Sequence, residues 1–250
     1  GVRLVGSEMC IRDSYNTTYM GDKKTIPVLL YGQIRGIIAF DRFHKDYLNS
    51  KKYNYEFYLG GWNSHIENQI KLPFKNKILV NEKELRDEFK DLTLPRIKNK
   101  GILDLTAARI SYHYKNLKQV TKDRLSKAEF CIVCRADYFL NFSDVEKHLD
   151  ELFKSDINLL ELPFISLKDG LAVDMYFQAP NDGFFISNLK GLNLMFEMYD
   201  NVFHKKELED IKIDPIVGPH QTMANYIIKK NIKVITNKIN VLINTPLARR

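Results

Sequence analysis

The feature that most constrains the fold is a repeated succession of short apolar runs and helical stripes. Ile26 to Tyr31 reads IPVLLY and Phe130 to Cys134 reads FCIVC, as expected of strands buried on both faces of a parallel sheet. Between Gly36 and Ser50, apolar residues recur at spacings of three and four, which is typical of a helix packed along one face. Strands that alternate with helices predict βαβ units, and therefore an α/β domain with a mostly parallel sheet.

Weaker patterns extend this succession along the chain. Further strands are expected at Tyr53 to Leu59, Lys77 to Val80, Leu159 to Phe164, Leu171 to Phe177, Ile232 to Ile235 and Ile239 to Ile243. Further helices are expected after Asn81, over Asp104 to Arg124, from Ser143 to Phe153, over Leu189 to Phe203 and over Pro219 to Lys230. Asn81 with Glu84, and Ser143 with Glu146, have the spacing of a capping box. No repeat or low-complexity linker interrupts residues 15–250, which we expect to form a single domain.

The first fourteen residues differ from the rest. Gly6 to Ser14 reads GSEMCIRDS and resembles, without a mismatch, the translation of a transposase adapter used in sequencing-library preparation. We therefore treat residues 1–14 as non-native and exclude them from fold reasoning. A gene joined to an adapter at one end can be cut short at the other, so a truncated C-terminus belongs to the same expectation.

Composition excludes few function classes. The 250 residues are 44% hydrophobic and 28% charged, as in ordinary globular proteins, and the net charge is +7. A basic surface favours anionic partners, although scattered lysines alone produce the same charge. The aromatics sit mostly at core spacing rather than among clustered basic residues, so no nucleic-acid partner is expected. Without an apolar run of about 20 residues or a signal peptide, we expect a cytoplasmic protein with at most peripheral membrane contact.

Cys131 and Cys134 have the C-x-x-C spacing of zinc and redox sites. Residues three apart in a strand point to opposite faces, so the two sulfurs cannot share a tetrahedral metal. We interpret both as small buried core residues. A G-x-x-x-x-G-K-[ST] phosphate loop is also missing from the sequence, which argues against the kinases and sulfotransferases that need one.

Candidate binding residues follow three predicted strands. In an open α/β sheet, ligands bind beyond the carboxyl ends of the strands. Glycines there allow close backbone approach, and arginine and aspartate suit a diphosphate and a hard cation such as Mg²⁺ or Mn²⁺. These residues are Gly32, Gln33 and Arg35 after the first strand, Trp62 after the second, and Arg135 and Asp137 after FCIVC. Ordinary turns, a core tryptophan and a surface ion pair explain the same residues equally simply.

Two candidates lie later in the chain. Asp182, in an Asn-Asp-Gly turn, is a candidate general base for an acceptor hydroxyl, with Asp174 a weaker one. His220, at the start of the last predicted helix, is a candidate contact for diphosphate or acceptor, because helix N-termini favour anions. A plain turn and an exposed capping histidine are the alternatives.

The order of these motifs resembles GT-A-type glycosyltransferase-like proteins of bacteria and phages. VLLYGQIRG, from Val28 to Gly36, is similar to a G-Q-x-R opening, and the segment from Phe57 to Trp62 is similar to an F-x-x-x-W motif. VCRAD, from Val133 to Asp137, stands where the family has a metal-binding D-x-D, here reduced to R-x-D. NDGFFIS and the helix opening at Pro219 continue the match, although His220 and Gln221 replace the expected glutamate.

The resemblance implies a GT-A-like fold, a mixed and mostly parallel sheet flanked by helices. It implies a glycosyltransferase that moves a sugar from a nucleotide-sugar donor to a cell-surface polysaccharide or lipopolysaccharide-type acceptor, glycan or lipid-linked. Carried over by position, the donor would contact Gly32, Gln33, Arg35, Trp62, Arg135 and Asp137, with Asp137 also the ligand of a divalent Mn²⁺ or Mg²⁺. Asp182 would be catalytic, and His220 would face acceptor or diphosphate. The altered motifs keep a catalytically degenerate sugar-nucleotide-binding domain as the alternative.

Overall fold

The computed structural model describes residues 23–34, 38–62, 67–90, 102–138, 142–154, 160–162, 183–208, 218–232 and 234–236. Within them, seven strands form one sheet in the order β3-β2-β1-β4-β6-β5-β7. The strands are β1 (Thr25–Gln33), β2 (Asn54–Trp62), β3 (Phe74–Val80), β4 (Phe130–Arg135), β5 (Leu160–Leu162), β6 (Phe184–Asn188) and β7 (Val234–Thr236).

The sheet is mixed and mostly parallel. β1 runs parallel to both β2 and β4, β2 parallel to β3, and β5 parallel to β7. β6 lies between β4 and β5 and is antiparallel to both. The expected α/β architecture is confirmed, but a strand at Phe184–Asn188 was not expected. A run buried on both faces does not reveal its direction, and here it inserts between two strands that precede it in the chain.

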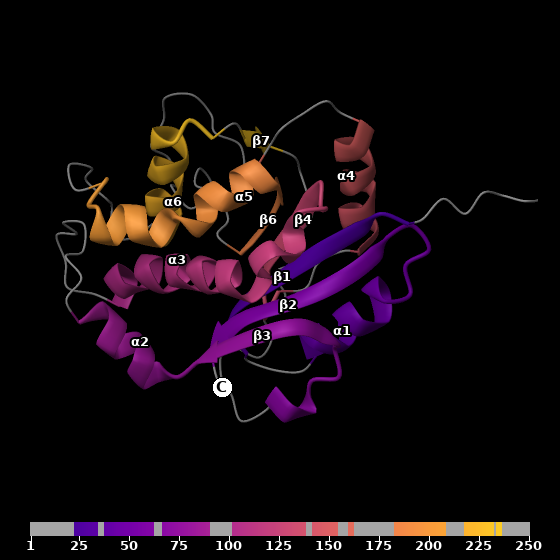
Figure 1. The fold of residues 1–250 in the computed structure, drawn as a ribbon, viewed down its shortest axis with the longest axis horizontal. Coiled ribbons are helices and arrows are strands. Elements are labelled where there is room, and N and C mark those ends of the chain that lie inside the picture. The colour runs from indigo at the N-terminus through magenta and orange to yellow at the C-terminus, as the bar shows by residue number, and fades with distance from the viewer. Residues whose placement is uncertain are drawn as a thin grey trace, which may run out of the picture.

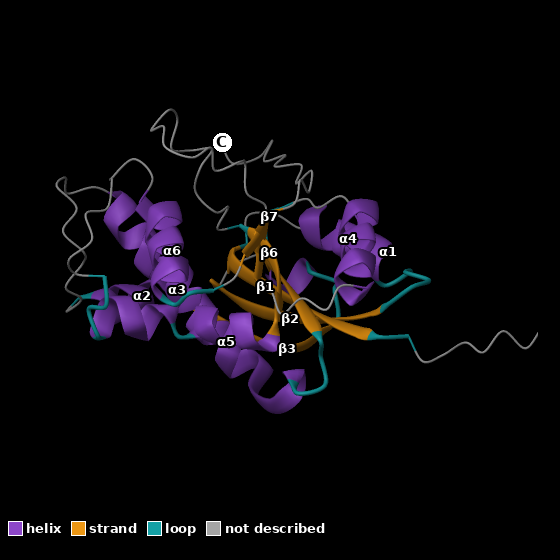
Figure 2. Cartoon of the chain, turned by 90° about the horizontal axis from the view of Figure 1, so that it is seen from above, coloured by secondary structure: helices purple, strands orange, loops and turns teal. Residues whose placement is uncertain are grey.

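Helices cover both faces of the sheet (Figures 1 and 2). α1 (Ile38–Tyr47) and α4 (Phe142–Lys154) lie on one face. α2 (Glu82–Phe89), α3 (Ile102–Thr121), α5 (Leu189–Phe196) and α6 (Gly218–Lys229) lie on the other. The described part of the chain therefore has three layers. No helix in that part combines the length and the apolar character needed to cross a bilayer.

Each central strand divides its side chains between two cores. Cys131 packs in the core on the α3 face, whereas Cys134 packs in the core on the α1 face. Both thiols are free and buried, and burial raises the pKa of Cys131 to about 12 and that of Cys134 above its ordinary value. The opposite orientation of the two cysteines, which argued against a shared metal, is confirmed.

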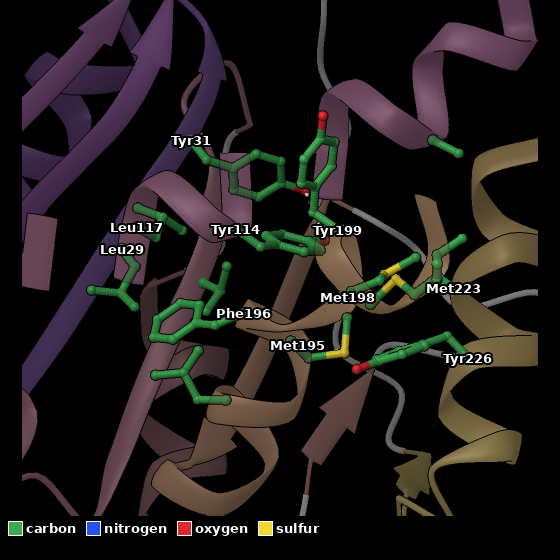
Figure 3. Packing of buried hydrophobic residues seen from close by; sticks show 14 of the residues in the cluster. Leu29, Tyr31, Tyr114, Leu117, Met195, Phe196, Met198, Tyr199, Met223 and Tyr226 are labelled. Atoms are coloured by element: carbon green, nitrogen blue, oxygen red, sulfur yellow. Dashed lines mark hydrogen bonds between the residues drawn. The ribbon is translucent and has the colours of Figure 1, made fainter. Parts of the chain in front are cut away.

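The core on the α3 face joins β1 to three helices (Figure 3). Tyr31 from β1 meets Tyr114 from α3 with ring centroids 5.1 Å apart in an edge-to-face arrangement. Met195 of α5 and Met223 and Tyr226 of α6 extend the same core away from the sheet. The packing fixes α3 directly beneath the carboxyl ends of β1 and β2, the place where candidate site residues were expected.

Helix boundaries agree with the sequence in part. Asn81 caps α2 with the predicted capping box, completed by Glu84. The second predicted box is wrong: α4 already begins at Phe142, and Glu146 instead accepts a hydrogen bond from the Ser50 hydroxyl. The helix expected over Leu189 to Phe203 is α5 followed by a π-helical turn, Asp200–His204. The strands expected at 171–177 and 239–243, and the atypical segment 1–14, lie outside the described residues.

Candidate functional site

The carboxyl ends of β1, β2 and β4 adjoin one another. Gln33 pairs in register with Trp62 of β2, and Tyr31 pairs with Arg135 of β4. Since β6 is antiparallel, its first residues reach the same edge, and the Gly183 carbonyl accepts a hydrogen bond of 2.8 Å from the Arg135 backbone N–H. Segments about a hundred residues apart in sequence thus meet where open α/β sheets bind ligands.

Two glycines at this edge occupy positions that do not suit a side chain. Gly32 has φ of +92°, a conformation that residues with a Cβ rarely adopt. A Cβ built on Gly61, its partner in register, would lie only 2.8 Å from the Gly32 carbonyl oxygen. The paired glycines leave the backbone one residue before the ends of β1 and β2 without side chains, so a ligand can approach it there.

Arg135 and Asp137 form a two-pronged ion pair. Arg135 Nε and one terminal nitrogen each donate to a different Asp137 oxygen at 2.9 Å, and only 7% of the Asp137 side chain is exposed. The guanidinium lies 4.8 Å from the centroid of the Tyr138 ring. Burial is the largest single influence and lowers the pKa of Arg135, but the hydrogen bond to Asp137 and the charges of Asp137 and the nearby tyrosines together raise it above its ordinary value. The structure therefore brings together the R-x-D pair with the arginine holding the aspartate in place.

A divalent metal on Asp137 has no ready-made centre in the described residues. Among them, no group of three or more His, Cys, Asp or Glu side chains is arranged to hold an ion. Both oxygens of Asp137 accept from Arg135, so a hard cation would share this carboxylate with a guanidinium of like charge. The residues described do not fit a metal as they stand, and metal binding at Asp137 stays a prediction.

Trp62 belongs to a cluster with two residues of α3. The Arg109 guanidinium carbon lies 5.3 Å from the centroid of the indole, and the His113 ring centroid lies 6.0 Å from it. Trp62 Nε1, Arg109 Nε and His113 Nδ1 are each buried without a hydrogen-bond partner. We call these residues the Trp62–Arg109–His113 cluster. Buried polar groups are almost always paired, so three such atoms in one cluster make it a candidate binding site.

His113 is neutral in this environment. Only 3% of it is exposed, and burial lowers the pKa of its imidazole to about 3 against an opposing hydrogen bond to the Gly60 backbone. The positive charges of Arg109 and Arg135 lower the pKa further. Both arginines therefore act on the same imidazole, which places the cluster beside the Arg135–Asp137 pair.

Of the remaining predicted site residues, Gln33 and His220 belong to the described structure and two others do not. Gln33 ends β1 and is exposed, as a ligand contact can be. His220 lies in the first turn of α6, which packs against α3, the helix that carries Arg109 and His113. Arg35 and Asp182 lie outside the described residues, so their roles stay predictions.

Sequence reasoning missed Arg109 and His113. They are four residues apart on α3 and so share one helix face, adjacent to its apolar stripe. That spacing was the available signal, because two basic residues at the border of a buried stripe are uncommon in a purely structural helix. Their link to Trp62 depends on the packing of α3 under β2, and no local pattern gives it.

Comparison with known proteins gives likenesses to solved structures alone. No protein-family model and no curated protein matches the chain. Mouse xyloside xylosyltransferase 1 has 10% identity and a TM-score of 0.48, covering 85% of each chain. A glycosyltransferase involved in glycosylation of the major capsid of PBCV-1 has 9% identity and a TM-score of 0.44, covering 85% of this chain and 81% of the other.

A third similar structure carries a different activity in its name. The 4-diphosphocytidyl-2C-methyl-D-erythritol synthase of Anaerococcus prevotii has 12% identity and a TM-score of 0.42, covering 89% of this chain and 92% of the other. Because identities and TM-scores are this low, none of these likenesses carries an argument about function.

Proposed function

We propose that the chain is a glycosyltransferase that binds a nucleotide-sugar donor at the carboxyl edge of β1, β2 and β4. The acceptor in this proposal is a glycan or lipid-linked precursor of the cell-surface polysaccharide or lipopolysaccharide type. One observation carries the proposal: Gly32, Trp62 and the Arg135–Asp137 pair meet at one edge. Bare backbone, an indole and a guanidinium in one place suit a nucleotide diphosphate.

The proposed roles follow the chemistry of the leaving group. Departure of a nucleoside diphosphate requires positive charge near its oxygens, which Arg35 and Arg135 would supply. Asp137 orients the Arg135 guanidinium through its two hydrogen bonds. Asp182 would activate or position the acceptor hydroxyl, and His220 would contact acceptor or diphosphate. A divalent ion, if bound, would supply further charge to the diphosphate.

One observation favours a second candidate, a sugar-nucleotide-binding domain without catalysis. Both oxygens of Asp137 are engaged by Arg135, so the R-x-D motif here forms a closed pair rather than an open carboxylate. Such a pair can bind a diphosphate through the outer face of the arginine without activating it. This candidate predicts that donor binds and is not consumed.

Thermal unfolding with a panel of nucleoside diphosphates and nucleotide sugars, with and without Mn²⁺, tests the proposal. A ligand at 100 times its dissociation constant stabilises the fold by about 2.7 kcal/mol, which such melts detect. A selective shift, followed by release of nucleoside diphosphate in the presence of acceptor, is the expected result. A shift without release supports the binding domain, and no shift from a cooperatively unfolding protein contradicts both candidates.

A further inference from the structure

The charges at the carboxyl edge do not balance. Arg135 is neutralised by Asp137, whose two oxygens it engages at 2.9 Å. His113 is buried and neutral, so it adds no charge. Arg109 is partly buried, and no carboxylate among the described residues forms an ion pair with it. Among the described residues, one positive charge therefore remains without a carboxylate partner beside the ends of β1, β2 and β4.

Its surroundings make that charge costly without a ligand. Arg109 Nε is buried and unpartnered in the described structure, and the guanidinium lies against the Trp62 indole, 5.3 Å from its centroid. The indole gives a cation–π attraction but accepts no hydrogen bond from the N–H groups. A partly buried guanidinium with an unpartnered Nε–H is stabilised by an anion with several acceptor oxygens.

We propose that Arg109, with Trp62 Nε1 as a second donor, binds a phosphate group of the ligand. This refines the proposed function, on which it rests, by naming Arg109 rather than the already neutralised Arg135 as the principal cation for the nucleotide diphosphate. Trp62 Nε1 is a buried, unpartnered donor in the same cluster and so can donate to the same anion. Arginine suits this role because its planar fork of donors matches two phosphate oxygens.

His113 narrows the chemical class of the ligand. Its bond to the Gly60 backbone raises its pKa, so the imidazole is the donor and the carbonyl oxygen the acceptor. Since Nδ1 has no partner, Nε2 makes that bond, and Nδ1 of the neutral ring can only accept. A hydroxyl group of the ligand can donate to this nitrogen. The cluster therefore offers donors to phosphate oxygens and one acceptor to a hydroxyl, a combination that suits a phosphate ester of a sugar or nucleoside.

Calorimetric titration of the whole chain and two arginine variants tests the assignment. The probes are UDP, GDP, glucose 1-phosphate and inorganic pyrophosphate. Arg109→Met removes the charge and keeps the stem, and Arg124→Met is the matched control. Arg124 is exposed beyond the far end of α3 and donates to the Lys75 carbonyl oxygen. We expect Arg109→Met to weaken the tightest phosphate ester by at least about tenfold and Arg124→Met to leave its affinity unchanged.

Each outcome separates this inference from the proposed function. Nucleotide binding that survives Arg109→Met overturns the inference and leaves the proposed function standing. Binding of glucose 1-phosphate alone, lost in Arg109→Met, supports the inference and contradicts nucleotide recognition. If no probe binds wild-type protein, or if pyrophosphate binds more tightly than every ester, the inference fails. Should Arg109→Met not fold, Arg109→Lys replaces it, with a loss of several-fold expected because the donor fork is missing.

Discussion

The amino and carboxyl edges of the sheet differ in how many of their polar side chains have hydrogen-bond partners. At the amino edge, where β2 begins, three side chains of the preceding loop form hydrogen bonds with α4. Ser50 donates to Glu146 at 2.5 Å, and both Lys52 and the Tyr53 hydroxyl donate to Asp150 at 2.6 Å. These bonds hold the loop before β2 against α4.

At the carboxyl edge the opposite holds. Trp62, Arg109 and His113 each retain a buried polar atom without a partner in the described structure. Four other described residues also have such an atom: Tyr47 among aromatic rings of the α1 face, Asn116 on α3, Asn225 on α6, and Glu207, whose oxygen lies 2.8 Å from Lys230 Nζ. A network in which each polar group has a hydrogen-bond partner indicates a structural role. Several unpartnered polar atoms around one positive charge indicate a ligand site. From this difference we assign a stabilising role to the amino edge and a ligand-binding role to the carboxyl edge.

The largest expected effect is a loss of unfolding free energy as the pH falls below neutral. The folded-state pKa of His113 is lowered to about 3, below its ordinary 6.5, so its stabilising contribution is present above pH 6.5. This contribution is lost as the pH falls from 6.5 towards 3, because in this range His113 binds a proton in the unfolded chain but not in the folded one. The slope is at most about 1.4 kcal/mol per pH unit. Urea unfolding at several pH values measures it.

The control for that slope is His113→Phe, which cannot take up the proton. The charges that act on the imidazole, those of Arg109 and Arg135, are the same in wild-type and variant. The difference between wild-type and variant curves between pH 4 and 6.5 isolates His113 from the carboxylates. Parallel curves would show that the imidazole is not buried as described.

The next effect concerns the ion pair at the ligand edge. Asp137→Asn keeps the shape of the side chain but removes the charge that holds the Arg135 guanidinium. Under the proposed function we expect donor turnover to fall by about a hundredfold or more, because the cation near the leaving group loses its orientation. Release of nucleoside diphosphate measures this, with melting temperature as the check on folding. Unchanged turnover in a folded variant would remove the pair from the mechanism.

A smaller effect is expected from His113→Phe at neutral pH. The substitution keeps a ring of similar volume and leaves the Gly60 carbonyl without its donor. A buried carbonyl left unpaired costs about 1–3 kcal/mol, read from denaturant midpoints. A gain in stability would mean that the imidazole is retained at a cost, which would strengthen a ligand-binding role at this edge.

The smallest effect is expected at the amino edge. Tyr53→Phe removes one hydrogen bond to Asp150, which keeps its second bond, from Lys52. We expect a loss of about 1 kcal/mol or less, because the carboxylate is partly exposed and stays paired. Ligand affinity should not change, in contrast to the variants at the other edge. A weakened donor affinity in Tyr53→Phe would break the division between the two edges.

The sequence predicted features that depend on local chemistry. The alternation of FCIVC placed Cys131 and Cys134 on opposite faces, and the Asn81–Glu84 box placed the start of α2. The carboxyl ends of β1, β2 and β4 were expected to gather candidate residues, and Gly32 and Arg135 do lie on neighbouring strands there. In each case a short-range rule, of strand period or helix capping, determines the outcome.

What escaped prediction depends on tertiary packing. The insertion of antiparallel β6 (Phe184–Asn188) between β4 and β5 leaves no mark on its own apolar sequence. Ser143 was expected to cap α4, but Glu146 bonds Ser50 across the fold. The spacing of Arg109 and His113 was the one local signal for Arg109, and its contact with Trp62, 47 positions away, depends on the packing of α3 under β2.

Hydrogen–deuterium exchange with and without the nucleotide sugars that shift thermal unfolding tests the division between the edges most directly. Our account predicts added protection at the carboxyl ends of β1, β2 and β4, around Gly32, Trp62 and Arg135, and in the middle of α3. It predicts no change between Ser50 and Tyr55 or in α4. Protection confined to the amino edge, or a bound ligand that leaves the carboxyl edge unchanged, would contradict the assignment of the site.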